Sequence, residues 1–474
     1  MDKQYFLDTF KVSTPDLETI AAEAISKGGD WSDLYFENSL YGDLLLKDGE
    51  VTSGGLHSDF GVGIRVLSGE KTGYAYSETT DLKDMKAAAK AASLIAEGNA
   101  QKKVGTCAFE VKAISGANLY PMATDWNKAK AQELLPFLKK LENSISSRDS
   151  RIIKIVARLA YSRSDIMMFN SDGELTYDIR PMCSVTASVI FSSGKKSESK
   201  TVSRSFRTGA ELLSDKLIEE MAAEVTTGID DRFDAKRPKG GKMPVVMGAG
   251  ASGILLHEAM GHAFEADFNR KGQSVFSGKT GQKICDSSIS IVDDGTIPAG
   301  RGSCTFDDEG VPGQKTYMVK DGILNSYLHD RISARWYGVS PTGNGRRESF
   351  RYNPIPRMRA TYMESGNCSP DDIVSSVKKG IFVNEFSNGQ VKIGEGDFTF
   401  YVKSGYMIEN GRLTAPVKDI NIIGNGPQAL ADIVAVGNDL KIDNGTWTCG
   451  KDQSVPVSCG MPTVLVKSLT TGGE

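Results

Sequence analysis

The sequence has neither a large net charge nor a long apolar run. Lys and Arg number 56 against 60 Asp and Glu, which gives a formal charge of −4, so no overall field favours nucleic acid. The longest apolar stretches are far shorter than the ~20 residues that a membrane-spanning helix needs. The first residues, Met1 to Phe6, contain an early acid and no apolar core, so a secretory signal is not expected. We predict a protein that binds neither nucleic acid nor membrane.

Cysteine is too scarce and too scattered for a disulfide framework. The seven cysteines, an odd number, are spread between Cys107 and Cys459. In a chain of this size such a pattern is typical of reduced thiols in a cytoplasmic protein. We therefore predict a cytoplasmic location, with most of these thiols buried.

Length and composition indicate a globular chain of more than one domain. Its 474 residues exceed one ordinary core. With 39% hydrophobic and 24% charged residues, the composition excludes a disordered chain, a collagen-like fibre and a coiled coil. The 50 glycines favour many turns and strand connections over long helices.

Periodic patterns predict an α+β fold. The expected helices are 14–25, 82–96, 129–145 and 210–225, and the expected strands include 33–37, 44–46, 61–67, 72–76, 152–161 and 183–191. A basic, turn-prone stretch at 236–242 predicts a solvated linker, and beyond it the chain is mostly short strands with one helix from about Gly253. We predict an N-terminal α/β-sheet domain over residues 1–235. A C-terminal domain over residues 236–474, dominated by antiparallel β-sheet, carries this helix.

The helix near Gly253 bears two of the four histidines in the chain. His257 and His262 lie five residues apart, and Glu258 follows the first. On a regular α-helix this spacing turns the side chains apart by about 140°, against about 40° for the four-residue spacing of the zincin motif H-E-x-x-H. A local π-type winding would bring the imidazoles together, and Gly261 would tolerate it. Taken alone, the motif fits two buried histidines beside a capping or ion-paired acid better than it fits a metal site.

Further segments place this motif in a wider context. Together they resemble the TldD/PmbA family over nearly the full chain, most strongly from residue 245 onward. The segments are 257–262 (HEAMGH), 308–314 (DEGVPGQ), 328–331 (LHDR), 343–347 (GNGRR), 353–358 (NPIPRM), 449–457 (CGKDQSVPV) and 469–473 (LTTGG).

The resemblance implies a zinc-dependent metallopeptidase that hydrolyses unfolded or short peptides. The zinc ligands that it implies are His257, His262 and Cys449, so the helix near residue 253 becomes the metal-site helix. It also implies Glu258 as the general base that activates a zinc-bound water. Cys459 lies where the family requires no cysteine, and we expect it to serve packing.

This ligand set is chemically coherent. A hydrolytic zinc site needs three protein ligands and an open position for water. Two neutral imidazoles and one thiolate leave the ion with one net positive charge, which lowers the pKa of bound water and polarises the scissile carbonyl. Glu258 would take the water proton and return it to the leaving amine.

The resemblance further implies a dimer around an inner chamber. The second subunit is either another copy of the chain or a relative that lacks the zinc motif. An alternative is a non-enzymatic partner or scaffold subunit of such a two-component complex, with the gyrase-modulator role to which family names allude. The intact set His257, Glu258, His262 and Cys449 favours the enzyme.

Other polar residues favour structural roles. His329 fits a hydrogen-bonded loop residue better than an oxyanion stabiliser, and His57 has no partner nearby in sequence. Ser252 is expected to cap the metal-site helix. A basic cluster could receive a peptide carboxylate, but we expect it to pair with the acids Asp307, Asp308 and Glu309. The cluster consists of Arg346, Arg347, Arg351, Arg357 and Arg359.

Overall fold

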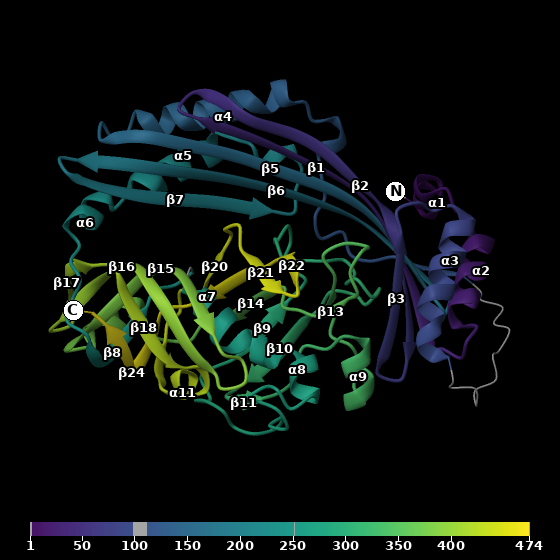
Figure 1. The fold of residues 1–474 in the computed structure, drawn as a ribbon. Helices are drawn as coiled ribbons and strands as arrows, with labels where there is room; N and C mark the ends of the chain where they lie inside the picture. The colour runs from purple at the N-terminus through teal and green to yellow at the C-terminus, as the bar shows by residue number, and fades with distance from the viewer. Residues whose placement is uncertain (1, 98–110, 251, 474) are drawn as a thin grey trace.

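The computed structural model describes residues 2–97, 111–250 and 252–473 (Figure 1). Cys107, one of the seven cysteines, lies outside the described residues. The other six are free thiols, and all of them except Cys368 are buried. Within the described ranges, no helix has the length and apolar character needed to cross a membrane.

One large sheet forms the N-terminal half. Its strands are β1 (Trp31–Lys47), β2 (Glu50–Ser68), β3 (Lys71–Ser77), β4 (Lys112–Ile114), β5 (Ile152–Asn170), β6 (Glu174–Ser193) and β7 (Lys196–Phe206). They pair in the order β3-β2-β1-β5-β6, and both β4 and β7 pair with β6. The pairings are antiparallel except that of β4 with β6. The strands arch over the rest of the molecule (Figure 1).

Helices cover one face of this sheet. They are α1 (Lys3–Phe10), α2 (Thr14–Ile25) and α3 (Leu82–Ser93) at one end, α4 (Ala131–Ser146) and α5 (Asp215–Thr226) along the other end, and α6 (Ile229–Asp234) leading away (Figure 1). Because side chains alternate along a strand, Phe36 and Leu46 of β1 pack toward the helices. The intervening Tyr35 packs against Phe306 and Phe350 of the C-terminal half.

A ring of strands forms one layer of the C-terminal half. Its members are β8 (Gly241–Met247), β15 (Lys379–Val391), β16 (Asp397–Glu409), β18 (Ile420–Asn425) and β24 (Val464–Gly472), with β17 (Arg412–Val417) and β19 (Ile433–Val436) attached outside. They pair in the order β15-β8-β24-β18-β16, and β16 pairs with β15 to close the ring. The β8–β15 pairing is parallel and the others are antiparallel.

A second sheet and two hairpins complete this half. The sheet has the order β11-β10-β9-β14-β23-β20, with only β14–β23 parallel among its described pairings. Its strands are β9 (Ile291–Asp294), β10 (Lys315–Lys320), β11 (Ile323–Leu324), β14 (Ala360–Met363), β20 (Lys441–Asp443) and β23 (Ser458–Met461). The hairpins are β12 (Gly345–Arg346) with β13 (Ile355–Pro356), and β21 (Thr448–Lys451) with β22 (Gln453–Pro456).

The C-terminal half also contains short helices. They are α7 (Gly253–Leu256), α8 (Ala266–Arg270), α9 (Arg331–Tyr337), α10 (Pro370–Ser375) and α11 (Gly426–Ala431). A single apolar cluster contains Leu255, Leu256 and residues of both strand layers, such as Met247 and Met461. The α+β class with a sheet-rich C-terminal half is therefore confirmed.

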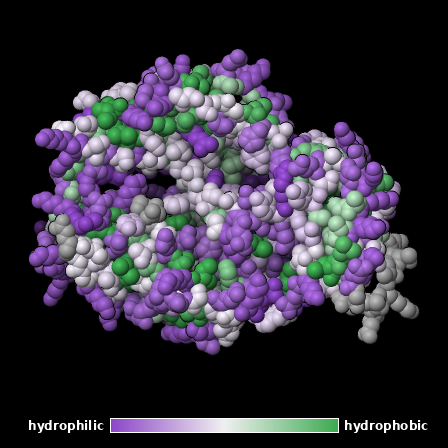
Figure 2. Space-filling model, viewed as in Figure 1, coloured by the Kyte–Doolittle hydropathy of each residue, from purple (hydrophilic) through white to green (hydrophobic). Residues whose placement is uncertain are grey.

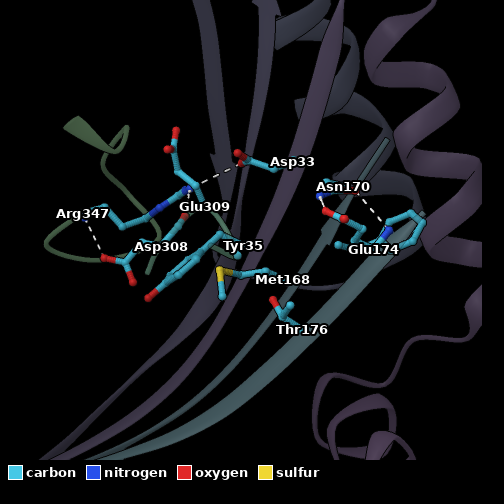
Figure 3. A pocket seen from close by; sticks show the side chains of 11 residues that line it. Asp33, Tyr35, Met168, Asn170, Glu174, Thr176, Asp308, Glu309 and Arg347 are labelled. Atoms are coloured by element: carbon cyan, nitrogen blue, oxygen red, sulfur yellow. Dashed lines mark hydrogen bonds and ion pairs between the residues drawn. The ribbon is translucent and has the colours of Figure 1, made fainter. Parts of the chain in front are cut away.

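A buried ion-pair network joins the two halves. Arg65 of β2 donates to Glu309 at 2.6 Å and also pairs with Asp33 of β1. Arg347 lies 3.4 Å from the Asp33 carboxylate and donates to the main-chain carbonyl of Asp308 (Figure 3). The pocket lined by these side chains has a volume of about 10 Å³, which is room for about one water molecule. The network therefore anchors the halves to each other and leaves no space for a ligand.

Elsewhere the two halves enclose open space. Two cavities of about 760 and 650 Å³ lie between the large sheet and the C-terminal half. Figure 2 shows the molecule hollowed between these two layers. The hairpin β21–β22 lies in this region, between the large sheet and the C-terminal strands (Figure 1).

Candidate metal centre

The metal-site helix changes its winding at the first histidine. Residues Gly253–Leu256 are α-helical, and His257–Gly261 form a π-helical turn. The N–H of His262 donates to the carbonyl of His257, five residues earlier, which is the hydrogen bond that defines π winding. The two imidazole rings lie 5.2 Å apart at an angle of 80°. The expected π-type winding is thus present, and it places both rings on the same side of the helix.

Two expectations about this helix need correction. Gly261 has ordinary helical angles (φ −57°, ψ −49°), so backbone freedom is not why glycine is needed there. Instead, a Cβ at this position would lie 2.2 Å from the sulfur of buried Met358, and glycine permits that close packing. Ser252 makes no capping hydrogen bond, and its hydroxyl has no described partner.

The third predicted ligand comes from a distant hairpin. Cys449 lies on β21, and its sulfur is 3.4 Å from Nε2 of His262. One donor atom from each of His257, His262 and Cys449 lies within 4.8 Å of the other two. Arg357 donates to the Cys449 carbonyl at 2.6 Å and fixes the hairpin in place. The structure thus brings together the three predicted ligands.

A buried carboxylate orients the second histidine. Glu265 accepts from Nδ1 of His262 at 2.9 Å, which leaves Nε2 facing Cys449. The ammonium of Lys451 donates to the same carboxylate oxygen at 3.0 Å and to Asp267 at 2.8 Å. Burial alone would raise the pKa of Glu265, but Lys451 and His262 lower this pKa to about 2. The carboxylate is therefore ionised at any working pH.

The thiol of Cys449 is ionised by its neighbours. Burial alone would raise its pKa, but the neighbouring imidazoles of His257 and His262 lower the pKa to about 4. The same thiolate and Glu265 raise the pKa of His262 to about 10, against the effect of burial. The pair is then a thiolate beside an imidazolium. A thiolate is the form of cysteine that binds metals, and a bound metal ion would replace the proton on Nε2 of His262.

These donors fit a zinc ion. His257 is 1% exposed, yet neither of its ring nitrogens has a hydrogen-bond partner among the described residues. A buried polar atom without a partner is costly, and a metal ion would satisfy it. Two imidazoles and a thiolate are ligands that zinc prefers, and three ligands leave one position open. The Glu265 contact to His262 is the outer-shell carboxylate common at zinc sites.

Glu258 and Cys459 occupy different environments. Glu258 lies in the π turn, is partly exposed, and makes no hydrogen bond or ion pair to a described residue. It is not one of the three clustered ligands. Cys459 lies on β23, is 1% exposed and belongs to the apolar core, where burial raises its pKa well above the usual range. It therefore serves packing, as expected.

The remaining histidines lie outside the cluster. His329 is buried between Tyr327 and Tyr337, with ring centroids 6.2 and 5.2 Å away, and its Nδ1 has no described partner. Burial lowers its pKa to about 4, so it is neutral at physiological pH. His57 is exposed and stacks on Tyr41 at 5.0 Å.

The expected pairing of the arginine cluster with the neighbouring acids is wrong for the described residues. The Arg347 guanidinium reaches only the main-chain carbonyl of Asp308, whose carboxylate pairs with Arg180. Arg351 pairs with Asp59 and Glu78 of the N-terminal half. Glu309 pairs instead with Arg65, outside the cluster. Main-chain carbonyls accept the hydrogen bonds of the other three arginines, which are Arg346, Arg357 and Arg359.

Sequence reasoning missed the residues that support the ligands. Glu265 lies three residues after His262, and such an acid faces the histidine on a helical turn, so its spacing was a usable signal. Lys451 follows the ligand Cys449 by two residues but points toward Glu265. The contact between Arg357 and the Cys449 carbonyl joins residues 92 positions apart, and no local sequence pattern predicts it.

Family models match most of the chain. The model described as PmbA/TldA metallopeptidase C-terminal domain matches residues 240–473. The models for domain 1 and the central domain of the same family match residues 32–96 and 125–228.

Several similar proteins carry metalloprotease names. The metalloprotease TldD homolog of Haemophilus influenzae is 38% identical over 450 residues, which is 94% of this chain and 93% of that protein. The metalloprotease TldD homolog of Buchnera aphidicola is 37% identical over 475 residues, or 98% of each chain. A zinc metalloprotease TldD homolog of Saccharolobus solfataricus is 33% identical over 258 residues, which is 54% of this chain and 57% of that protein.

Solved structures share the fold at lower identity. A protein of Thermotoga maritima described as a putative modulator of a DNA gyrase has a TM-score of 0.77 and 23% identity, covering 97% of this chain and 99% of that one. TldE of Thermococcus kodakarensis has a TM-score of 0.74 and 17% identity, covering 97% and 100%. At these identities the likeness establishes the fold alone.

Proposed function

The chain belongs to the PmbA/TldD metallopeptidase family, and from this premise we propose that it is a zinc-dependent peptidase acting on unfolded or short peptides. The observation that carries the proposal is the approach of His257, His262 and Cys449 to within 4.8 Å in a buried site. The metalloprotease names of its relatives support the same reaction class.

In this proposal His257, His262 and Cys449 hold the ion. Bound there, zinc supplies a Lewis acid that polarises a peptide carbonyl and acidifies water. Glu265 keeps the proton of His262 on Nδ1, so that Nε2 presents its lone pair to the ion. The supporting side chains come from residues 236–474, which we propose as the catalytic domain, with residues 1–235 as a separate N-terminal domain.

We assign the proton transfers to Glu258. Its carboxylate follows directly after a ligand in the π turn, and it is partly exposed and has no described partner. It is therefore free to accept a proton from an attacking water and to donate it to the leaving amine. A general base of this kind typically contributes about 10²–10⁴ to the rate.

The cavity of about 650 Å³ suits an extended peptide. It is lined by residues 200–204 of β7, by residues 441–447, and by Ala249 and Gly250 just before the metal-site helix. Strand β7 pairs on one side with β6, and an extended peptide can bind the main chain of an edge strand with little demand on its own sequence. Unfolded or short peptides meet that requirement, because a folded segment cannot extend.

The proposal includes a second subunit and a reducing location. A relative named TldE shares this fold, which supports a two-subunit assembly, either with a relative that lacks the zinc motif or with a second copy. A metal-binding thiolate must stay reduced, so we place the protein in the cytoplasm.

The Glu258→Gln variant tests the catalytic assignment. It should keep zinc, because the three ligands are unchanged, and lose at least about 100-fold in peptide turnover. Metal content and cleavage of a peptide library are measured in reducing buffer, alone and with the motif-lacking relative. Glu395→Gln, an exposed carboxylate paired with Lys392, is the matched control. Turnover that is unchanged in Glu258→Gln would refute this base.

The alternative is a non-enzymatic partner or scaffold role. One protein of the same fold is described as a putative modulator of a DNA gyrase, which is the observation that keeps this role open. The same library digestion separates the two functions. A zinc-loaded wild-type protein that cleaves no peptide, with or without the relative, would favour the scaffold.

A further inference from the structure

The cavity of about 760 Å³ has an unusual excess of positive charge. Among the described residues, seven arginines and only four acids line it. Asp308 is already paired with Arg180, and Asp59 with Arg351. Burial raises the pKa of a third acid, Glu37, to about 7, which weakens its negative charge near neutral pH. The acids of the cavity therefore do not neutralise its arginines.

Four of the arginines have no described carboxylate within ion-pair distance. None of them forms an ion pair with a carboxylate of a described residue, and each is at most 8% exposed. We call them the unpaired arginines; they are Arg207, Arg301, Arg346 and Arg359. Arg301 makes its hydrogen bonds to neutral groups: it donates to the Trp447 carbonyl at 2.9 Å and to the Ser205 hydroxyl at 2.6 Å.

The side-chain hydrogen bonds of the other unpaired arginines also go to neutral groups. Arg346 donates to the Met358 and Pro456 carbonyls, and Arg359 to the Gly343 carbonyl. One terminal nitrogen of Arg359 and Nε of Arg207 are buried without a described partner. Burial, together with the charge of Arg359, lowers the pKa of Arg346 well below its usual range. Asp308 acts on Arg346 and Arg359 only from beyond ion-pair distance. Buried charges without a directly paired counter-charge are expensive, so the cavity favours an anion.

The cavity and the metal centre border the same hairpin. Thr448, Ser454 and Pro456 of β21–β22 line the cavity. The side chain of Cys449, next to Thr448, points the other way, toward the histidines. Sheets packed face to face lie roughly 10 Å apart, a distance that an extended peptide covers with about three residues. A peptide held at the metal centre can therefore reach the unpaired arginines.

We propose that the unpaired arginines bind a carboxylate of the peptide substrate, about three residues from the bond that is cleaved. This inference rests on the proposed peptidase function and adds a substrate preference to it. A carboxylate is the anion that an unmodified peptide itself carries, and the planar guanidinium matches it with two parallel hydrogen bonds. Its source is either an acidic side chain or the C-terminal carboxylate.

Matched peptides test this preference. One set places Glu at successive positions around the cleaved bond, a second set has Gln at the same positions, and each is made with a free and an amidated C-terminus. The zinc-loaded protein should show kcat/KM at least about 10-fold higher for a Glu or free-acid peptide than for its neutral counterpart. Dependence on Glu position identifies a side chain, and dependence on amidation identifies the C-terminus.

Arginine variants assign the preference to the cavity. In Arg207→Gln and Arg301→Gln, the ratio of kcat/KM for the acidic peptide to kcat/KM for the neutral peptide should fall toward one. Because any loss of folding or activity that affects both peptides equally cancels in this ratio, the ratio reports the preference alone. Arg335→Gln, an exposed arginine on α9, should keep the wild-type ratio. A ratio near one in the wild type, or a ratio that survives both cavity variants, would overturn the proposal. If inorganic phosphate inhibits the cleavage of acidic and neutral peptides equally, and the wild type shows no preference for the acidic peptide, the proposal is also overturned.

A binding measurement separates this proposal from the peptidase itself. Dissociation constants of the Glu and Gln peptides are measured on zinc-loaded Glu258→Gln, which needs no turnover. If the wild type cleaves neither peptide, the peptidase proposal fails, while tighter binding of the acidic peptide still supports the cavity. If both peptides are cleaved and bound equally, only the cavity proposal fails.

Discussion

Replacing Glu265 with Gln isolates the support of one zinc ligand. The carboxylate accepts from Nδ1 of His262 at 2.9 Å and is fully buried. The amide of Gln keeps the shape and one acceptor oxygen but removes the charge. With the charge gone, Nδ1 is held less firmly, and Nε2 donates less electron density to the metal.

The size of the effect follows from the contacts. A hydrogen bond to a charged group contributes about 1.5–3 kcal/mol, and outer-shell changes at metal sites cost about 10–100-fold in affinity. The two figures agree, because a factor of ten is about 1.4 kcal/mol. We therefore expect Glu265→Gln to weaken zinc binding about 10–100-fold. Because the pKa of Glu265 is lowered to about 2, the loss should be the same from weakly acidic to weakly basic pH.

Asp267 provides a matched control for this change. Lys451 donates to Asp267 at 2.8 Å and to Glu265 at 3.0 Å, but Asp267 makes no described contact with His262. Asp267→Asn thus removes a charge next to Lys451 and leaves the histidine untouched. Zinc affinity is measured by competition with a chelating dye in reducing buffer. Equal weakening in Asp267→Asn and Glu265→Gln would show that Glu265 acts through Lys451, which would refute the reasoning.

Three further changes test other parts of the structure. Cys449→Ala should abolish zinc binding, whereas Cys459→Ala should keep it; metal analysis that gives the reverse would exclude Cys449 as the third ligand. Burial lowers the pKa of His329 from 6.5 to about 4, so acid should lower the free energy of unfolding of the wild type by about 3 kcal/mol through this residue. His329→Gln should remove that loss. The neutral form stabilises the fold above pH 6.5, and this stability is lost as pH falls toward 4, so urea unfolding should show a shallower pH dependence in the variant. Gly261→Ala should cost about 1–3 kcal/mol by overpacking, because its Cβ would lie 2.2 Å from the Met358 sulfur, and the cost should shrink in a Met358→Ala background.

The strands show where sequence patterns were sufficient and where they failed. The sequence predicted separate strands at 33–37 and 44–46, yet β1 runs without a break through both. Gly42 and the polar Ser39 lie between these two segments and interrupt the apolar strand pattern. In the structure a Cβ at Gly42 would lie 2.2 Å from Tyr161, and Ser39 bonds Ser164 of the next strand. Polar residues continue the strand there because its inner face borders the cavity between the two halves.

The helices were easier to predict, because their apolar stripes bury against one sheet face. The expected helix at 129–145 is α4, with Leu134, Leu138, Leu141 and Ile145 buried at helical spacing. Helix α1 was not predicted, since eight residues are too few to establish a period.

For the metal centre, the sequence alone predicted the local winding at His257 and His262. Five residues separate His257 from His262, and only a π turn lets such a pair share one ion, so the spacing itself carried that information. Family resemblance, read from the same sequence, pointed to Cys449 and Glu258. What the tertiary structure decided is the environment: Cys449 approaches His262 across 187 residues of chain, while Glu265 and Arg357 complete its surroundings. Contacts of that separation arise from the packing of two sheets and a hairpin, which no local period encodes. The same packing leaves four arginines at one cavity without direct ion pairs to described carboxylates.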